Sequence, residues 1–144
     1  MSETELPGPM NRLSLGDCAI TSDLVPRGWK APAPDTGIYA EGDLFWTKAT
    51  ERARVFVGTK GRSALIVTVH IGPNGGTVEL RAAAVGHVLP MAPNETRSVE
   101  FDLVPQADWV PISIRASRAF RPADVDPQSG DQRLLGCQVR VTLR

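Results

Sequence analysis

Residues 119–144 read Ala-Phe-Arg-Pro-Ala-Asp-Val-Asp-Pro-Gln-Ser-Gly-Asp-Gln-Arg-Leu-Leu-Gly-Cys-Gln-Val-Arg-Val-Thr-Leu-Arg. The first half is a loop punctuated by proline and aspartate, and the second half is a strand in which every other side chain is apolar. The alternating apolar residues are Leu135, Cys137, Val139, Val141 and Leu143. A period of two is typical of a strand that buries one face. Together with the Gly-Asp-Leu-Phe-Trp-Thr segment at residues 42–47, this strand predicts an all-β sandwich.

The same alternation recurs along the chain and predicts further strands. Residues 64–71 carry apolar side chains on both faces, which indicates a central strand, whereas Pro111 suggests an edge strand or a strand entrance at residues 109–116. Glycine-rich segments at residues 58–61 and 72–76 are typical of hairpin turns. The expected strands are residues 52–57, 64–71, 77–83, 95–104, 109–116 and 135–143, with shorter candidates near Leu13 and Leu15, at residues 38–39 and at residues 44–47.

No stretch shows the apolar stripe of a helix, and twelve prolines and thirteen glycines interrupt the chain. We therefore expect an antiparallel β-sandwich of the jelly-roll type, with about six to eight strands and little or no helix. A chain of 144 residues has the size of one domain. We expect residues 1–10 to form a flexible arm and residues 11–144 to form a single sandwich domain.

Charge and hydropathy exclude two classes of partner. Sixteen basic and sixteen acidic side chains cancel, so the chain lacks the net positive field expected of a nucleic-acid-binding protein. No window approaches the roughly 18 consecutive apolar residues that a membrane span needs. The first residues lack the features of a secretion signal, which predicts a cytoplasmic location, although a partner could display the domain on a surface or particle.

The two cysteines, Cys18 and Cys137, lie near opposite ends of the chain. A sandwich can bring its first and last strands together, so a disulfide is geometrically conceivable. Two reduced, partly buried thiols are the expected state for a chain without a secretion signal. Whether the two cysteines pair is left open by the sequence.

A family resemblance rests on short blocks in a fixed order. The blocks are Leu15-Gly16, Gly28-Trp29, Gly37-Ile38-Tyr39, Phe45-Trp46-Thr47, Arg54-Val55-Phe56-Val57, Phe120-Arg121-Pro122-Ala123-Asp124 and Asp131-Gln132-Arg133-Leu134-Leu135-Gly136. Over about residues 13–144 the chain resembles a jelly-roll-like accessory domain found with bacterial glycosyltransferases and other polysaccharide-related proteins. The resemblance implies a carbohydrate-binding-module-like domain associated with surface polysaccharide, without a defined catalytic set.

Aromatic residues are the natural candidates for a sugar site, because the apolar face of a pyranose packs on a flat ring while carboxylates and arginines bond its hydroxyls. The preferred patch joins Trp29 and Tyr39 with Asp35 and Glu41. Trp46 precedes a core strand, so it is expected to be a buried structural ring more than a surface on which a sugar packs. For Trp109 the sequence favours neither role. The candidate ligand-binding residues are Trp29, Asp35, Tyr39, Glu41, Trp46 and Trp109.

The acidic loop before the last strand offers weak metal candidates in Asp124, Asp126 and Asp131. Aspartates beside proline, serine and glycine more often form turns, and nearby arginines at 118, 121 and 133 are expected to pair with them. His70 and His87, the latter expected in a loop, lack metal-ligand spacing. No nucleophile elbow or phosphate loop is present, so we expect no cofactor and no enzyme activity.

These observations favour a non-catalytic module that recognises surface polysaccharide or a glycan-bearing partner. The alternative is a structural subunit of a surface appendage or phage-like particle, which would bind protein partners or further copies of itself through its arm and edge strands. Exposure of the aromatic rings and the oligomeric state distinguish the two.

Overall fold

The computed structural model of the protein describes residues 12–15, 18–21, 38–41, 44–58, 62–103 and 109–144. For residues 12–15 and 18–21, Ala40 and Trp109, only the backbone is described. The predicted arm, residues 1–10, lies outside the described residues, as do Trp29 and Asp35 of the predicted ligand site.

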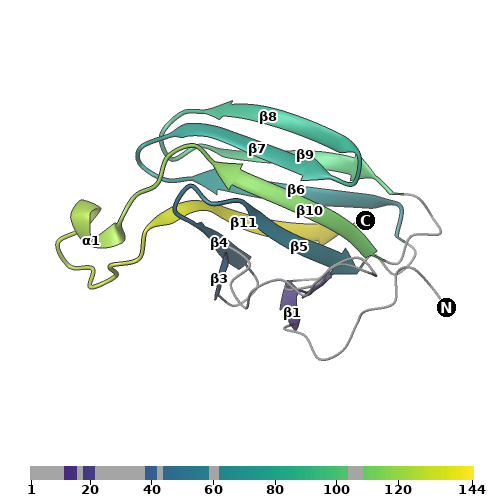
Figure 1. Cartoon of the computed structure of the whole chain (residues 1–144), viewed down its shortest axis with the longest axis horizontal. Helices are drawn as coiled ribbons and strands as arrows, with labels where there is room; N and C mark the ends of the chain where they lie inside the picture. Colours follow the sequence, from purple (N-terminus) through teal and green to yellow (C-terminus); the bar gives the residue numbers. More distant parts are fainter. Residues whose placement is uncertain (1–11, 16–17, 22–37, 42–43, 59–61, 104–108) are drawn as a thin grey trace.

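Two antiparallel sheets stack face to face, and a short helix, α1 (Pro122–Val125), projects at one end (Figure 1). The six-stranded sheet has the order β1 (Arg12–Leu15), β2 (Cys18–Thr21), β5 (Ala53–Gly58), β10 (Trp109–Ala116), β7 (Gly76–Ala82) and β8 (Val85–Met91). The five-stranded sheet has the order β3 (Ile38–Glu41), β4 (Leu44–Lys48), β11 (Leu135–Leu143), β6 (Ala64–Ile71) and β9 (Thr96–Asp102). The expected all-β sandwich is confirmed.

The connectivity is that of a jelly roll. From β4 to β11, successive strands alternate between the two sheets, except that β7 and β8 form a hairpin within one sheet. The resulting orders, β4-β11-β6-β9 and β5-β10-β7-β8, are those of two interlocked Greek keys. These eight strands are the upper end of the expected range, and β1, β2 and β3 bring the described total to eleven.

The core lies between the inward faces of the two sheets. Phe45, Leu65 and Ile114 are at most 1% exposed and belong to one apolar cluster. All five alternating residues of the last strand are buried, as predicted: Leu135, Cys137, Val139, Val141 and Leu143. The thiol of Cys137 is free. In the part of the chain that the structure describes, no helix has the length and apolar character needed to cross a membrane.

Strand β6 lies between β11 and β9, which confirms the expected central position. Its outward side chains are half-buried, and two of them contact hydroxyl groups of β9. Thr68 Oγ1 and Ser98 Oγ lie 2.8 Å apart, and His70 Nδ1 lies 2.8 Å from Thr96 Oγ1. His70 is therefore a satisfied strand residue.

Strand β10 is not an edge strand, so that alternative for Pro111 is wrong, but Pro111 lies near the start of β10, which agrees with the other alternative, a strand entrance. It lies between β5 and β7, and Pro111 pairs with Phe56 of β5. The Pro111 carbonyl accepts a hydrogen bond from the Ala83 amide at 3.0 Å. The N and C=O of one strand residue point to the same side, so the missing N–H of Pro111 faces the turn that follows β7, where the β7 pairing has ended. A central strand therefore tolerates this proline.

His87 lies on β8 and not in a loop, which is a second correction. Its register partner is Leu80 of β7, and its ring meets Phe101 of β9 edge-on at 5.4 Å between centroids. This contact joins the edges of the two sheets.

Candidate functional site

Tyr39 and Trp46 are direct neighbours across the β3–β4 pair. In β4, Phe45 and Thr47 are buried, so alternation places Trp46 on the outer face of the five-stranded sheet. Tyr39 and Trp46 are both half-buried. Trp46 is therefore not buried in the core as expected, because its position in β4 has the opposite parity to the core residues.

Glu41 connects Trp46 to the loop that precedes β11. The indole Nε1 of Trp46 donates a hydrogen bond to Glu41 Oε2 at 3.2 Å. The other carboxylate oxygen, Glu41 Oε1, lies 2.6 Å from Arg133 Nη2. Glu41 is thus held by a ring on one side and by a guanidinium on the other, which fixes its orientation.

Arg133 also binds Asp131. Its Nη2 lies 2.7 Å from Asp131 Oδ2, and its backbone amide donates to Asp131 Oδ1 at 3.0 Å. These hydrogen bonds lower the pKa of Asp131 to about 2. The hydrogen bonds to Asp131 and Glu41 raise the pKa of Arg133 above its usual value. Asp131 and Arg133 are therefore both charged at neutral pH.

Two cations lie against the ring of Tyr39. Lys48 Nζ is 4.8 Å from the ring centroid, and the guanidinium carbon of Arg133 is 5.0 Å from it. Cations at this distance are attracted by the negative face of an aromatic ring, typically by about 0.5–1 kcal/mol at an exposed site. The contacts hold the Tyr39 ring in place at the surface.

Phe120 packs against the Trp46 ring. The two rings meet edge-on, with 5.7 Å between centroids and 68° between planes. Phe120 packs directly on the backbone of Gly72, where a Cβ atom would collide with its ring. This packing attaches the segment before α1 to the sandwich. We call the whole group the Tyr39–Trp46 site, and its members are Tyr39, Glu41, Trp46, Lys48, Phe120, Asp131 and Arg133.

The polar groups of this site remain accessible to a ligand. The side chains of Glu41, Arg133 and Asp131 are 44%, 33% and 27% exposed. Exposed ion pairs contribute little to stability, so this network is chiefly a way of orienting groups. It presents two aromatic rings beside fixed hydrogen-bond donors and acceptors.

Of the six predicted ligand residues, Tyr39, Glu41 and Trp46 come together at this site. Trp109 begins β10 in the other sheet, and only its backbone is described. Trp29 and Asp35 lie outside the described residues. The sequence reasoning missed Lys48 and Phe120 as members, and it paired Arg133 with Asp131 without linking it to Glu41, which is 92 residues away.

The three aspartates proposed as weak metal candidates are separately engaged. Asp126 Oδ1 accepts a hydrogen bond from the Gln128 amide at 2.9 Å, which is the expected turn-forming role. Asp124 Oδ2 lies 3.5 Å from Arg121 Nη1, and Asp131 binds Arg133 as described above. Arg118 differs from the expectation, because it donates to the Asn74 carbonyl at 3.1 Å. Within the described ranges, no three His, Cys, Asp or Glu side chains gather as metal ligands.

Comparison with known proteins adds no relative to this picture. No family model, no curated protein and no solved structure matches the chain. The resemblance to the polysaccharide-associated domain family therefore stays a prediction.

Proposed function

We propose that the protein is a non-catalytic module that binds a polysaccharide or a glycan-bearing partner through the Tyr39–Trp46 site. The observation that carries the proposal is the pairing of Tyr39 with Trp46 on an outer sheet face, beside Glu41 and Arg133. A pyranose has an apolar face that packs on such rings and hydroxyls that bond to carboxylate and guanidinium groups. The family resemblance described from the sequence agrees with this class of ligand.

The site supports recognition without much rearrangement. Trp46 is oriented by its hydrogen bond to Glu41 and by Phe120, and the Tyr39 ring is held by Lys48 and Arg133. A preformed site loses less conformational entropy on binding. A surface site of this size still binds each sugar weakly, so retention on a polymer would come from several copies acting together.

The electrostatics of Asp131 do not suit it for the acid role in glycoside hydrolysis. Hydrolysis of a glycosidic bond needs a carboxylic acid that stays protonated near neutral pH, which requires a raised pKa. The pKa of Asp131 is instead lowered to about 2 by Arg133. Asp131 is therefore ionised under ordinary conditions and has no proton to donate.

A glycan array of bacterial capsular and exopolysaccharides tests the proposal. We expect the wild type to bind a subset of glycans and Trp46→Ala and Tyr39→Ala to lose that binding. Trp46→Phe keeps a ring but removes the indole donor to Glu41, so it should bind with intermediate strength. Val125→Ala is the control, because Val125 is 55% exposed and makes none of the contacts described for the site. A flat response of the wild type across all glycans, or equal binding by Trp46→Ala, would refute the proposal.

The alternative function, a structural subunit, is favoured by one observation at strand β8. Val85 and Val88 of this edge strand are 53% and 66% exposed, as an edge that meets another protein would be. Pro90 lacks an N–H, and its carbonyl accepts from Arg97 Nη1 at 3.3 Å, so this residue does not favour pairing of β8 with a further strand. Light scattering at rising concentration tests this alternative. Self-association that Val88→Lys abolishes would support it, and a strict monomer would remove self-assembly through β8.

A further inference from the structure

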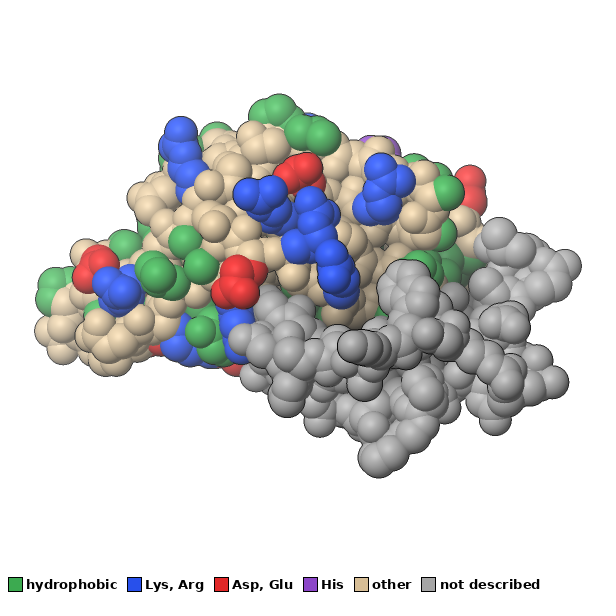
Figure 2. Space-filling view, in the orientation of Figure 1, with side chains coloured by type: hydrophobic (Ala, Val, Ile, Leu, Met, Phe, Trp, Pro, Cys, Tyr) green, Lys and Arg blue, Asp and Glu red, His purple; other side chains and the backbone are tan. Residues whose placement is uncertain are grey.

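The outer face of the six-stranded sheet carries a concentration of arginines. Figure 2 shows Lys and Arg side chains gathered in the middle of one face of the molecule, around an acidic side chain, over the sheet that faces the viewer in Figure 1. We call this surface the arginine face. Its exposed members are Arg52, Arg54, Arg81, Arg115 and Glu79.

Strand register explains why these side chains share a face. Arg54 of β5 and Arg81 of β7 are both register partners of Ser113 in β10, so the three form one row across three strands. Arg115 and Glu79 pair in the next row on the same face. Because neighbouring strands lie about 4.8 Å apart, Arg54 and Arg81 project from backbones roughly 9.5 Å apart.

Two of the guanidinium groups, those of Arg52 and Arg81, are held in place by neutral partners. Arg52 Nη1 donates to Ser113 Oγ at 2.8 Å, and Arg81 Nη1 donates to the Ala84 carbonyl at 3.2 Å. The guanidinium of Arg81 lies over Gly86, where an added Cβ would be 3.1 Å from Nη2. Bonds of this kind orient the positive charge without neutralising it.

One carboxylate faces four guanidinium groups on this surface. Glu79 Oε2 lies 3.9 Å from Arg115 Nη1, which is a weak contact between half-exposed side chains. Arg54 has no ion-pair partner within the described part of the chain. The face is thus locally positive although the whole chain is neutral. A protein with no net charge and a local basic surface favours anionic ligands at that surface alone.

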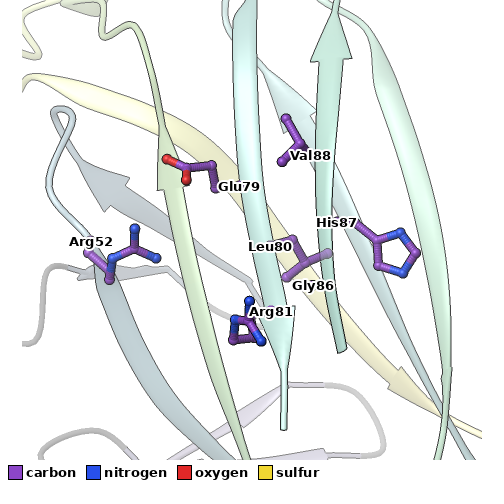
Figure 3. Close-up of a pocket in the computed structure, with 7 residues that line it drawn as sticks. All are labelled: Arg52, Glu79, Leu80, Arg81, Gly86, His87 and Val88. Carbon is purple, nitrogen blue, oxygen red and sulfur yellow. The ribbon is translucent and has the colours of Figure 1, made fainter. Parts of the chain in front are cut away.

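The arginine face is also hollowed. A depression of about 320 Å³ is lined by Arg52, Glu79 and Arg81 and by Gly86, His87 and Val88 of β8 (Figure 3). Figure 3 shows Arg52 and Glu79 on one side of β7 and Val88 and His87 at β8. The hollow therefore combines fixed cations, one carboxylate and an exposed aliphatic side chain.

We propose that the arginine face binds the carboxylate groups of an acidic, uronate-bearing polysaccharide. Guanidinium groups bind carboxylates through paired, charge-assisted hydrogen bonds. Ser113 and Glu79 supply groups for sugar hydroxyls, and Val88 supplies apolar contact. The proposal rests on the proposed function for the class of ligand, and it adds a second surface, in the opposite sheet from the Tyr39–Trp46 site.

The spacing of charges favours this polymer over a nucleic acid. Duplex DNA carries one negative charge per about 1.7 Å of its axis, and proteins that bind it bring dense arrays of cations. The arginine face has two rows, interrupted by Glu79 and Ser113, with the row partners roughly 9.5 Å apart. Sparse carboxylates separated by sugar hydroxyls match that arrangement.

Affinity electrophoresis in gels containing polygalacturonate tests the proposal, with dextran as the uncharged polymer and duplex DNA as the phosphate polymer. We expect polygalacturonate to retard the wild type and dextran to retard it less. The Arg54→Gln/Arg81→Gln variant should bind polygalacturonate on the order of tenfold more weakly, because two exposed cations are lost. Arg54→Lys/Arg81→Lys keeps the charges but not the paired geometry, so its binding should fall between the two. Retardation should also decrease as sodium chloride is raised.

Matched controls make the outcome specific. The two side chains exchanged, Arg54 and Arg81, are both exposed, so circular dichroism and the thermal midpoint should not change. Trp46→Ala should keep its retardation by polygalacturonate if the two surfaces act separately. Equal retardation of the wild type and the double Gln variant would overturn the proposal, as would stronger retardation by DNA than by polygalacturonate. If polygalacturonate does not retard the wild type but Trp46-dependent binding is seen on the glycan array, the proposal for the arginine face is refuted and the proposed function is retained. If neither retardation nor array binding is seen, both proposals are refuted.

Discussion

The hydroxyl of Thr47 accepts a hydrogen bond from the backbone amide of Cys137, with 3.0 Å between Oγ1 and N, although the two residues are 90 positions apart. The bond lies where β4 pairs with β11 and where the register shifts between Leu135 and Gln138. A bulge of this kind leaves a backbone group without its usual partner in the sheet. Thr47 is fully buried and supplies the missing acceptor. One hydroxyl therefore allows an irregular strand to pass through the core.

Replacing Thr47 by valine should destabilise the protein by about 1–3 kcal/mol. Valine has nearly the same shape as threonine, so the main effect is that the buried amide of Cys137 loses its acceptor. Thr47→Ser keeps the hydroxyl and should cost less than Thr47→Val. Urea denaturation at 25 °C measures both free energies of unfolding. The role assigned to the hydroxyl would be wrong if serine destabilised the protein more than valine.

Replacing Gly136 by alanine should also destabilise the protein, by about 1–3 kcal/mol, through overpacking. A Cβ atom at this position would collide with Thr47 Oγ1 and with the Ala49 carbonyl. The matched control is Gly130→Ala, because nothing lies within 4 Å of a Cβ atom at Gly130. Thermal denaturation should show a lower midpoint for Gly136→Ala and an unchanged one for Gly130→Ala. An equal midpoint for the two variants would contradict the packing argument.

The fold was predictable where alternation is local and regular. The expected bounds of the strands at residues 64–71 and 109–116 agree with β6 and β10, and the inward residues of β11 were identified correctly. Strand β8 was missed because Gly86 and Pro90 disrupt its pattern and its residues are mostly exposed. Its pairing with β7, and not its own propensity, makes it a strand.

The candidate site was predictable only in part, since it is assembled from distant segments. Tyr39, Glu41 and Trp46 lie close together in the sequence, and a single hairpin unites them. Phe120 and Arg133 reach the same place only because β11 pairs with β4, which no local pattern reveals. The arginine face was missed for a similar reason, because its charges come from strands whose order in the sheet differs from their order in the sequence.

The pKa of Asp131 should be measurably low and should depend on Arg133. Hydrogen bonds from Arg133 lower this pKa from 3.8 to about 2 in the folded protein. The folded state thus keeps the carboxylate ionised at a pH where the unfolded chain takes up a proton. The resulting stabilisation is complete above about pH 4 and is lost as the pH falls toward 2.

A carbon-13 NMR titration of the Asp131 carboxyl measures this pKa directly. In Arg133→Gln the midpoint should rise toward 3.8, because the principal hydrogen-bond donor is removed. The same variant should show less loss of stability between pH 4 and pH 2 than the wild type. Arg97→Gln, which removes a guanidinium 3.5 Å from Glu95, is the control and should leave the Asp131 midpoint in place. A wild-type midpoint near 3.8 would exclude the ion pair in solution.

The thiol of Cys137 should be inert in the native protein. Burial raises its pKa to about 12, so almost none of the reactive thiolate exists at pH 8, and the side chain is 0% exposed. In a Cys18→Ser background, iodoacetamide at pH 8 should leave the folded chain unmodified and should label it stoichiometrically in urea, as mass spectrometry would show. Labelling under native conditions reports transient opening, so Gly136→Ala should react faster than Gly130→Ala if the packing around Thr47 holds β4 and β11 together. Rapid alkylation of the folded Cys18→Ser protein would instead mean that this strand pair opens readily and that the core described between the two sheets is not closed at β11.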